Sequence, residues 1–446
     1  MLFFHPNNSG NRNKSQMSTK ISEVLNFICN HLLYPQNPLY LRSQIKIEPV
    51  IFFTIFLRRE FMRPLPILLR KHILSVKAYS SARSEYPTGS VKAAPNLAVQ
   101  TFLDANENAF GSPNGLAFNG VAVNRYPDPL QTALKRRIAD VKHLPPDRTN
   151  TIFLGNGSDE PIDLILRAFC EPSVYNTSGE VVLGDEIIIT PPTYGMYEVS
   201  AAIHNIMVCR VPLVRSLDEE SGSYSLDVEG VLQAISPRTK VIFLCSPNNP
   251  TANVFEREAL ERIIRGFEGI VVLDEAYIDF APKHSFLPRL QDFPNLIILQ
   301  TFSKAWGMAA LRLGMAFADE AIISVLNTIK PPYNINVLTQ ETAMTALYHG
   351  EWHDRVVSET IRERERLVAE LECVRLVQRV FPSDANFILV QFENARSIYE
   401  ALVQRHIVVR DRSGVALCDD CLRITVGTAE ENKRLLGALS EIADER

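Results

Sequence analysis

Residues 270–277 read Ile-Val-Val-Leu-Asp-Glu-Ala-Tyr, a run of four apolar residues that ends in two carboxylates. A short apolar run rich in β-branched residues favours a strand that is buried on both faces, as in a parallel sheet. Similar runs recur at 151–154, 186–190, 241–245 and 296–300, and helical patterns lie between them at 160–170 and 256–267. This alternation predicts parallel βαβ units and a large α/β domain over residues 130–335.

The pattern changes after residue 335. A long charged helix is expected near 351–372, and strand-like runs follow at 386–392, 407–410 and 421–426. Strands and helices that are grouped in this way favour a smaller α+β domain, which we place at 336–446. The predicted fold class is therefore α/β, with a large, mostly parallel sheet and a second, smaller α+β domain.

Composition narrows the class of protein. The chain has 446 residues, 46% of them hydrophobic and 22% charged, which is typical of a globular protein with about two domains. The formal net charge of -5 gives no electrostatic case for binding nucleic acid. No stretch reaches the roughly 18 to 20 apolar residues that a membrane span needs. We therefore expect a soluble enzyme with small-molecule substrates.

The seven cysteines are an odd number spread over a long chain, which argues against a secreted disulfide framework and favours a reducing compartment such as the cytoplasm. Cys418 and Cys421 form one CxxC pair, and the sequence offers no second pair of ligands for zinc or an iron-sulfur cluster. No metal site is expected.

The N-terminal part of the chain has a different composition. Residues 1–90 contain 12 Lys and Arg, 4 Glu and no Asp. We interpret residues 1–74 as a leader that is unstructured or wrongly included, with Met62 or Met17 as the real start. Mitochondrial import is the alternative, because transit peptides are basic and poor in acidic residues.

Polar residues follow several of the predicted strands. They are Gly155-Asn156-Gly157-Ser158-Asp159, Ser246-Pro247-Asn248-Asn249-Pro250-Thr251, Asp274-Glu275-Ala276-Tyr277, and Thr301-Phe302-Ser303-Lys304 with Arg312 eight residues later. In an open parallel sheet, ligands bind beyond the carboxyl ends of the strands. Taken singly, each group has another interpretation: a helix cap, a magnesium site at Asp274 and Glu275, or a surface lysine at Lys304.

Taken together, these groups meet the needs of one cofactor, pyridoxal 5′-phosphate. The cofactor requires a lysine amine for a Schiff base, a carboxylate for a protonated pyridine nitrogen, and an arginine with hydroxyl groups for its phosphate. Lys304 and Asp274 supply the first two, and Arg312 with Ser303 and Ser158 supplies the third. The sequence therefore predicts a pyridoxal-phosphate enzyme.

Longer motifs surround this set. They are Leu103-Asp104-Ala105-Asn106-Glu107-Asn108, Asn124-Arg125-Tyr126-Pro127-Asp128-Pro129, Pro191-Pro192-Thr193-Tyr194-Gly195-Met196-Tyr197 and Cys421-Leu422-Arg423-Ile424-Thr425-Val426-Gly427. With Asn249-Pro250-Thr251 and the groups above, they resemble class I/II aminotransferases of fold type I, and most closely the histidinol-phosphate aminotransferase family. The likeness covers residues 75–446. It implies that 75–129 form an active-site arm and the first segment of the small domain.

The resemblance implies roles for the matching residues. Lys304 would carry the cofactor and move the substrate proton, Asp274 would pair with the pyridine nitrogen, and Tyr277 would bind the ring 3-oxygen together with Asn249. Tyr194 would stack on the ring. The implied phosphate cradle is Gly157, Ser158, Asp159, Thr301, Ser303 and Arg312, with Tyr126 reaching in from the partner subunit of a homodimer.

The resemblance also implies the substrates: histidinol phosphate and 2-oxoglutarate, which yield imidazole acetol phosphate and glutamate. Arg410 and Arg423 match a pair that would grip the substrate phosphate, since two guanidiniums suit a dianion better than one. Asn106 and Glu107 would face the imidazole. The alternatives are a pyridoxal-phosphate aminotransferase or decarboxylase for another phosphorylated or aromatic amino substrate, and a non-catalytic regulator that binds the cofactor.

One position departs from the family pattern. Ala252 follows Asn249-Pro250-Thr251 where the family has glycine. If the backbone needs a positive φ at this position, the alanine carries a modest strain.

Overall fold

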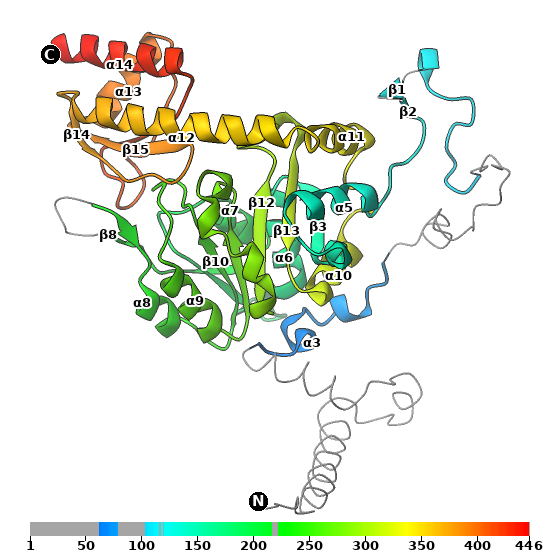
Figure 1. The fold of residues 1–446 in the computed structure, drawn as a ribbon. Coiled ribbons are helices and arrows are strands. Elements are labelled where there is room, and N and C mark those ends of the chain that lie inside the picture. The colour runs from blue at the N-terminus through cyan, green and yellow to red at the C-terminus, as the bar shows by residue number, and fades with distance from the viewer. Residues whose placement is uncertain (1–61, 79–102, 116, 119, 216–221, 446) are drawn as a thin grey trace, which may run out of the picture. The chain divides into compact units, whose positions relative to one another are not determined.

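The computed structural model describes residues 62–78, 103–115, 117–118, 120–215 and 222–445 (Figure 1). Residues 1–61 of the predicted leader lie outside this part of the chain. A seven-stranded sheet occupies its centre, in the order β3-β13-β12-β11-β10-β6-β7. The strands are β3 (Ile152–Asn156), β6 (Glu186–Ile189), β7 (Met207–Arg210), β10 (Thr239–Cys245), β11 (Ile270–Asp274), β12 (Leu296–Thr301) and β13 (Leu313–Phe317).

The sheet is parallel except at β13, which runs antiparallel to both β12 and β3. This confirms the predicted α/β class with a mostly parallel sheet, and all five predicted runs are strands of it. The sequence did not predict β7 and β13. Gly314 interrupts the short apolar run of β13, and β7 lies at the sheet edge, where its middle residues are only half-buried.

Helices cover both faces of the large sheet because their apolar residues repeat at helical spacing. On one face lies α6 (Asp159–Phe169), whose Ile162, Ile165, Leu166 and Phe169 are fully buried. The other helices that flank the sheet are α5 (Thr132–Val141), α7 (Met196–Ile203), α8 (Val228–Gln233), α9 (Arg257–Gly266), α10 (Glu320–Ile329) and α11 (Val337–Ala346). The strands thus have an apolar core on each side, which explains their nearly continuous apolar runs.

The first described segment packs onto this structure. Helix α3 (Leu65–Leu68) buries Leu68, and the backbone N–H of Arg70 donates to the carbonyl oxygen of Ala168 at 2.9 Å. The Arg70 side chain also pairs with Glu171 at 3.2 Å. The expectation of an unstructured leader is therefore wrong for residues 62–74, because an apolar contact and backbone hydrogen bonds hold them to α6.

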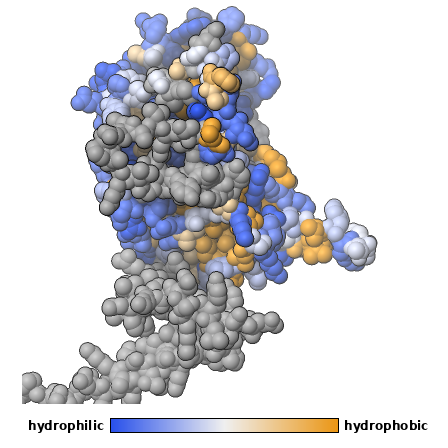
Figure 2. Space-filling model, turned by 90° about the vertical axis from the view of Figure 1, so that its right-hand side faces the viewer, coloured by the Kyte–Doolittle hydropathy of each residue, from blue (hydrophilic) through white to orange (hydrophobic). Residues whose placement is uncertain are grey.

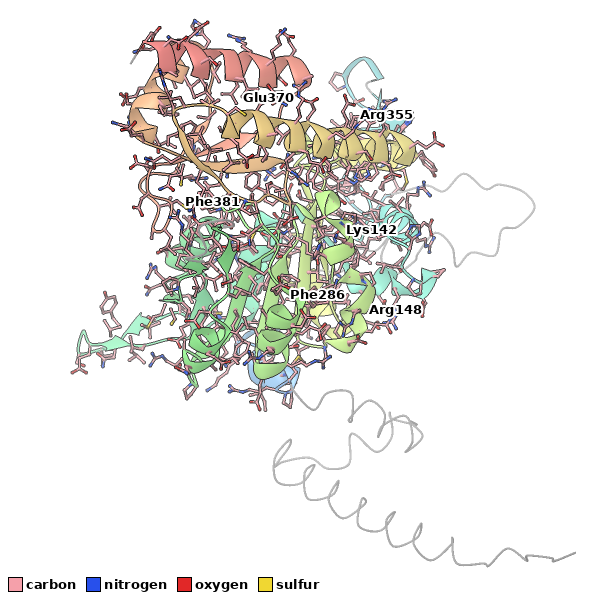
Figure 3. The ribbon with its side chains drawn as sticks, turned by 60° about the vertical axis from the view of Figure 1, so that its left-hand side comes forward. Lys142, Arg148, Phe286, Arg355, Glu370 and Phe381 are labelled. Atoms are coloured by element: carbon pink, nitrogen blue, oxygen red, sulfur yellow. The ribbon has the colours of Figure 1, made fainter. Side chains whose placement is uncertain are left out.

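A second, antiparallel sheet has the order β14-β15-β17-β16. Its strands are β14 (Val377–Val380), β15 (Phe387–Phe392), β16 (Arg410–Asp411) and β17 (Cys421–Thr425). One face is covered by α12 (Gly350–Glu372), α13 (Ala395–Gln404) and α14 (Ala429–Asp444). Figure 3 shows Arg355 and Glu370 on α12, and Phe381 at the junction of this part with the large sheet.

The strand predicted at 407–410 is shorter and later than expected. The Ile407 N–H donates to the carbonyl oxygen of Leu402, and His406 has a φ of 58°. These features close the C-terminus of α13, so residues 407–409 are tied to the helix end rather than to the sheet. The sheet begins at Arg410, which lies opposite Arg423 of β17.

The described part of the chain also contains three two-stranded hairpins. They are β1 (Ala117–Phe118) with β2 (Val121–Ala122), β4 (Val174–Tyr175) with β5 (Val181–Val182), and β8 (Val214–Arg215) with β9 (Tyr224–Ser225). Within the described ranges, no helix is both long enough and apolar enough to cross a membrane.

Several apolar side chains between residues 103 and 130 are exposed. Leu103, Phe110, Tyr126 and Leu130 are 84%, 101%, 51% and 47% exposed. Figure 2 shows hydrophobic residues in the lower half of the face that it draws and at its right side, and smaller hydrophobic groups among the hydrophilic residues of the upper part. Exposed apolar patches of this kind mark surfaces that another molecule covers.

Candidate active site

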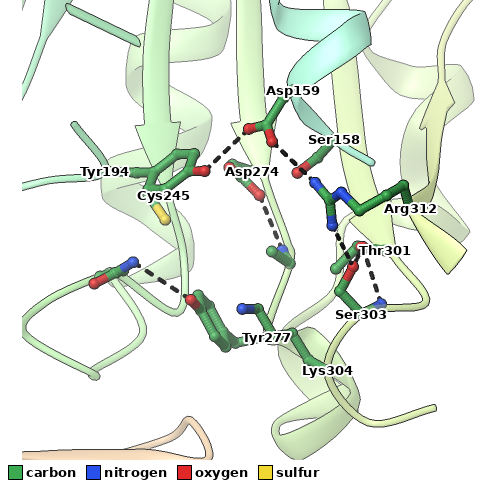
Figure 4. A pocket seen from close by; sticks show the side chains of 12 residues that line it. Ser158, Asp159, Tyr194, Cys245, Asp274, Tyr277, Thr301, Ser303, Lys304 and Arg312 are labelled. Atoms are coloured by element: carbon green, nitrogen blue, oxygen red, sulfur yellow. Dashed lines mark hydrogen bonds and ion pairs between the residues drawn. The ribbon is translucent and has the colours of Figure 1, made fainter. Parts of the chain in front are cut away.

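One cavity lies at the carboxyl ends of β10, β11 and β12, beside the start of α6 (Figure 4). Parallel strands place their carboxyl ends at the same edge, so side chains from distant parts of the sequence meet there. The lining residues are Ser158, Asp159, Tyr194, Cys245, Asn249, Asp274, Ala276, Tyr277, Thr301, Ser303, Lys304 and Arg312.

Asp274 lies at the base of the cavity and is 2% exposed. Its carboxylate accepts hydrogen bonds from the Tyr197 hydroxyl at 2.7 Å and from the Ala276 N–H at 3.0 Å. Burial raises the pKa of Asp274 to about 6, and these two donors limit the rise. Near neutral pH the site therefore holds a buried negative charge with few partners of its own, which suits a positively charged ligand atom.

Lys304 follows the end of β12 and points into the same cavity. Its Nζ lies 5.3 Å from the ring centroid of Tyr277. The pKa of Lys304 is lowered mainly by burial and, to a smaller extent, by the positive charge of Arg423. An amine with a lowered pKa is more often neutral, and the neutral amine is the form that attacks carbonyl groups.

Arg312 anchors a cradle of donors at the other end of the cavity. Its guanidinium lies 3.1 Å from Asp159 Oδ2 and 3.4 Å from Ser303 Oγ. The Thr301 hydroxyl donates to Ser303 Oγ at 3.0 Å, and Ser158 is the N-cap residue of α6. A guanidinium, hydroxyl groups and a helix N-terminus together form a typical site for a phosphate group.

Two glycines allow this cradle to close. Gly157 has a φ of 68°, and a Cβ there would come within 2.6 Å of an Arg312 nitrogen. Gly314 of β13 pairs with Gly155, and a Cβ on Gly314 would lie 2.2 Å from the backbone carbon of Gly157. The sequence indicated Gly157 but not Gly314, because a glycine within an apolar strand gives no distinct signal.

A hydrogen-bonded chain links the cavity to the small sheet. The Arg423 guanidinium donates to Asn249 Oδ1 at 2.5 Å, and Asn249 Nδ2 lies 3.3 Å from the Tyr277 hydroxyl. Tyr194 also lines the cavity, and its hydroxyl donates to Asp159 Oδ1 at 3.0 Å. Arg423 is thus the point at which the small sheet reaches the cavity.

Most predicted site residues meet in this cavity, and the structure adds some that the sequence did not indicate. The added residues are Cys245 and Ala276, which line the cavity, and Tyr197, which donates a hydrogen bond to Asp274. Tyr197 stands in the motif that contains Tyr194, but its pairing with Asp274 spans 77 residues and cannot be seen in the sequence.

Six predicted residues are not among those that line the cavity of this single chain. Two of them contact lining residues instead: the Gly157 N–H donates to the carbonyl oxygen of Arg312, and Arg423 donates to Asn249. Tyr126 stacks on Tyr333, with ring centroids 4.5 Å apart. Glu107 binds Arg125 at 2.7 Å and accepts a hydrogen bond from the Tyr126 N–H. The remaining two, Asn106 and Arg410, are exposed.

Ala252 has a φ of 70°, which confirms that the glycine-like backbone is retained at this departure from the family pattern. Its methyl group is fully buried in an apolar cluster with Tyr277 and Phe387. The carbonyl oxygen of Ala252 accepts a hydrogen bond from the Asp384 N–H at 2.8 Å. These contacts offset part of the strain, which is on the order of 1 kcal/mol.

Comparison with known proteins agrees with this geometry. The family model for aminotransferase class I and II matches residues 82–439. The chain is 49% identical over 372 residues to histidinol-phosphate aminotransferase from Cytophaga hutchinsonii, covering 83% of this chain and 97% of the relative. The chain therefore belongs to the class I and II aminotransferases.

Within that class, it belongs to the family of histidinol-phosphate aminotransferases. The structure of this enzyme from Clostridium acetobutylicum has the same fold, with a TM-score of 0.63 at 24% identity, covering 73% of this chain and 92% of the other. The structure of the enzyme from Sinorhizobium meliloti, in complex with pyridoxal-5′-phosphate, gives a TM-score of 0.61 at 25% identity. The match covers 72% of this chain and 84% of the other.

Replacing Asp274 by Asn should stabilise the protein once any cofactor has been removed. The pKa of Asp274 is raised on folding, so its contribution to stability is present below about pH 4 and is lost as the pH rises through about 6. A neutral amide avoids that loss. We expect Asp274→Asn to increase the free energy of unfolding at pH 8 by up to about 3 kcal/mol, and by about half as much at pH 5.

Urea unfolding at the two pH values measures this difference. Asp140→Asn, on the exposed surface of α5, removes the same charge and serves as the control. An effect of Asp274→Asn that is the same at pH 5 and pH 8 would contradict the account of this carboxylate.

Replacing Gly314 by Ala should weaken the phosphate cradle specifically. The added Cβ would displace the backbone of Gly157 and Ser158, because it would lie within 2.4 Å of both. We expect affinity for pyridoxal phosphate, the cofactor that the sequence predicts, to fall at least tenfold, about 1.4 kcal/mol. Equilibrium dialysis measures the affinity, and Gly437→Ala, at an open helical position, is the control. Equal affinities in both variants would show that the close approach of β13 is not needed.

Proposed function

We propose that this protein transfers the amino group of histidinol phosphate to 2-oxoglutarate, with pyridoxal 5′-phosphate as its cofactor. The observation that carries the proposal is one cavity that combines a buried carboxylate, a lysine amine with a lowered pKa and an arginine cradle. An arginine of the small sheet reaches the same cavity. The products would be imidazole acetol phosphate and glutamate.

The residues fit the cofactor at three points. The Arg312 cradle would hold its phosphate, Asp274 would pair with its ring nitrogen, and Lys304 would bind it covalently. Gly157 supports this assignment, because a side chain at that position would fill the cradle. When bound, pyridoxal phosphate supplies an aldehyde and an electron-withdrawing ring that stabilises negative charge on the substrate α-carbon.

Asp274 would keep the ring nitrogen protonated. A carboxylate buried at the base of the cavity has its strongest interaction with a cation, since little water screens the pair. The Tyr197 hydroxyl and the Ala276 N–H fix the orientation of the carboxylate. Asn249 and Tyr277 would donate to the ring 3-oxygen, and Tyr194 would cover one face of the ring.

Lys304 would act twice. Its amine would first hold the cofactor, and the incoming substrate amine would then release it. The freed Lys304 amine, which lines the cavity, would then be the base that takes the proton from the substrate α-carbon. Its lowered pKa supports this role, because a general base must be unprotonated near neutral pH.

Arg410 and Arg423 would bind the substrate phosphate. They lie directly opposite each other on β16 and β17, so their side chains share one face of the small sheet. For glutamate, the same arginines would bind carboxylates. Asn106 and Glu107 would face the imidazole, and Arg125 and the Tyr126 N–H hold the Glu107 carboxylate in place.

We also propose that the protein forms a homodimer in which Tyr126 enters the cavity of the partner subunit. The exposed apolar side chains of Leu103, Phe110, Tyr126 and Leu130 support this, because a second copy would bury them. A cytoplasmic location is supported by the free thiols of the described cysteines.

Lys304→Ala tests the covalent bond to the cofactor. Reduction with borohydride, followed by digestion and mass spectrometry, should place the cofactor on the peptide that contains Lys304. The variant should carry no such adduct and should lose transaminase activity. Lys283→Ala, which changes an exposed lysine, should keep both. An adduct on any other lysine of the parent protein would overturn the assignment.

The substrate assignment predicts a preference for the phosphate ester. Histidinol phosphate should exceed histidinol in kcat/KM by several orders of magnitude, since each charge-assisted hydrogen bond contributes about 1.5 to 3 kcal/mol. Arg423→Lys keeps the charge but loses the planar fork, so kcat/KM for histidinol phosphate should fall at least tenfold. Single-turnover spectra with histidinol phosphate, histidinol, histidine and glutamate measure both effects. Preference for histidinol or histidine would refute histidinol phosphate as the substrate, but it would not affect the assignment to the aminotransferase class.

A further inference from the structure

A third arginine lies beside the pair that would bind the substrate phosphate. Arg410 pairs with Arg423 across β16 and β17, and the Arg412 N–H donates to the carbonyl oxygen of Cys421, which continues the same ladder. Alternate residues of a strand point to the same face. Arg410, Arg412 and Arg423 therefore share one face of the small sheet, where diagonal neighbours on facing strands lie about 7 to 8 Å apart.

That face is the one that looks toward the cavity. Arg423 contacts Asn249 in the cavity wall, and its guanidinium lies 5.3 Å from the ring centroid of Phe387 on β15. The opposite face carries Leu422 and Ile424, which pack into the apolar core beneath α12, α13 and α14. Arg412 thus belongs to the side of the sheet that meets the cofactor cavity.

These three arginines have no partner carboxylate among the described residues. Asp411 stands between two of them in sequence, but it pairs with Arg396 at 3.3 Å. The Nε of Arg412 is buried and has no hydrogen-bond partner within the described part of the chain. Burial, then the charges of Arg423 and Arg410, lowers the pKa of Arg412. Like charges on facing strands destabilise a sheet unless an anion lies among them.

We propose that Arg412 is a third guanidinium of the substrate-phosphate site and a determinant of the preference for phosphorylated amines. The inference rests on the proposed function. A phosphate monoester dianion has three terminal oxygens, and two guanidinium forks leave acceptor positions on it unused. The buried Nε of Arg412 has no hydrogen-bond partner among the described residues, so it could donate to one of these positions. The cofactor phosphate has its own cradle at Arg312, so the two phosphate sites are separate.

The test compares substrates and variants in the holoenzyme. Arg412→Gln removes the charge and the fork, and Arg412→Lys keeps the charge alone. Arg405→Gln is the matched control, because Arg405 lies in the same part of the chain but pairs with Glu441 and Glu445 at the surface. The readouts are kcat and KM for histidinol phosphate and histidinol, and the inhibition constant of inorganic phosphate against histidinol.

For Arg412→Gln we expect the ratio of kcat/KM for histidinol phosphate to that for histidinol to fall at least tenfold, mainly through KM. The inhibition constant of inorganic phosphate should rise at least fivefold. Arg412→Lys should recover part of both losses, and Arg405→Gln should change neither. If Arg412 only supported the fold, its replacement would lower kcat/KM for both substrates by the same factor, and the ratio would not change.

An unchanged ratio together with an unchanged inhibition constant overturns the role of Arg412. A parent enzyme that does not prefer the phosphate ester refutes the proposed substrate instead. In that case the inhibition constant still decides whether Arg412 belongs to a phosphate site.

Discussion

The site depends on keeping a negative charge at the end of β11, where almost no water reaches it. Asp274 is buried beneath the cavity, and burial raises its pKa to about 6. The Tyr197 hydroxyl and the Ala276 N–H donate hydrogen bonds to the ionised carboxylate and stabilise it. The carboxylate therefore still loses its proton near neutral pH. The protein thus loses some stability at this position in order to keep a buried anion, as functional sites commonly do, and we propose that this anion faces the cofactor ring.

The sheet topology places the other groups around this carboxylate. The parallel strands β10, β11 and β12 deliver Asn249, Asp274 and Lys304 to one edge. The antiparallel strand β13 then brings Arg312 back to the start of α6, where Gly314 allows the close approach. Finally, Arg423 links the small sheet to Asn249, so a movement of the small sheet would reach the cofactor cavity directly.

The sequence predicted the parts of this structure that leave a local pattern. Apolar runs that end in polar residues indicated both the strands and the side chains at their ends, including Lys304. Contacts between distant segments left no such pattern. Nothing near Tyr197, Gly314 or Arg412 in the sequence indicates the residues that they contact in the fold. The packing of Leu68 against α6 likewise could not be seen in a basic, acid-poor segment.

The protonation state of the cofactor ring nitrogen tests the central claim most directly. The holoenzyme would be prepared with pyridoxal phosphate labelled with ¹⁵N in the ring, and the ¹⁵N chemical shift would be followed between pH 6 and pH 9. If Asp274 acts as described, the nitrogen stays protonated over this whole range, and it loses its proton in Asp274→Asn. A parent enzyme whose ring nitrogen is unprotonated at pH 7 would contradict the account.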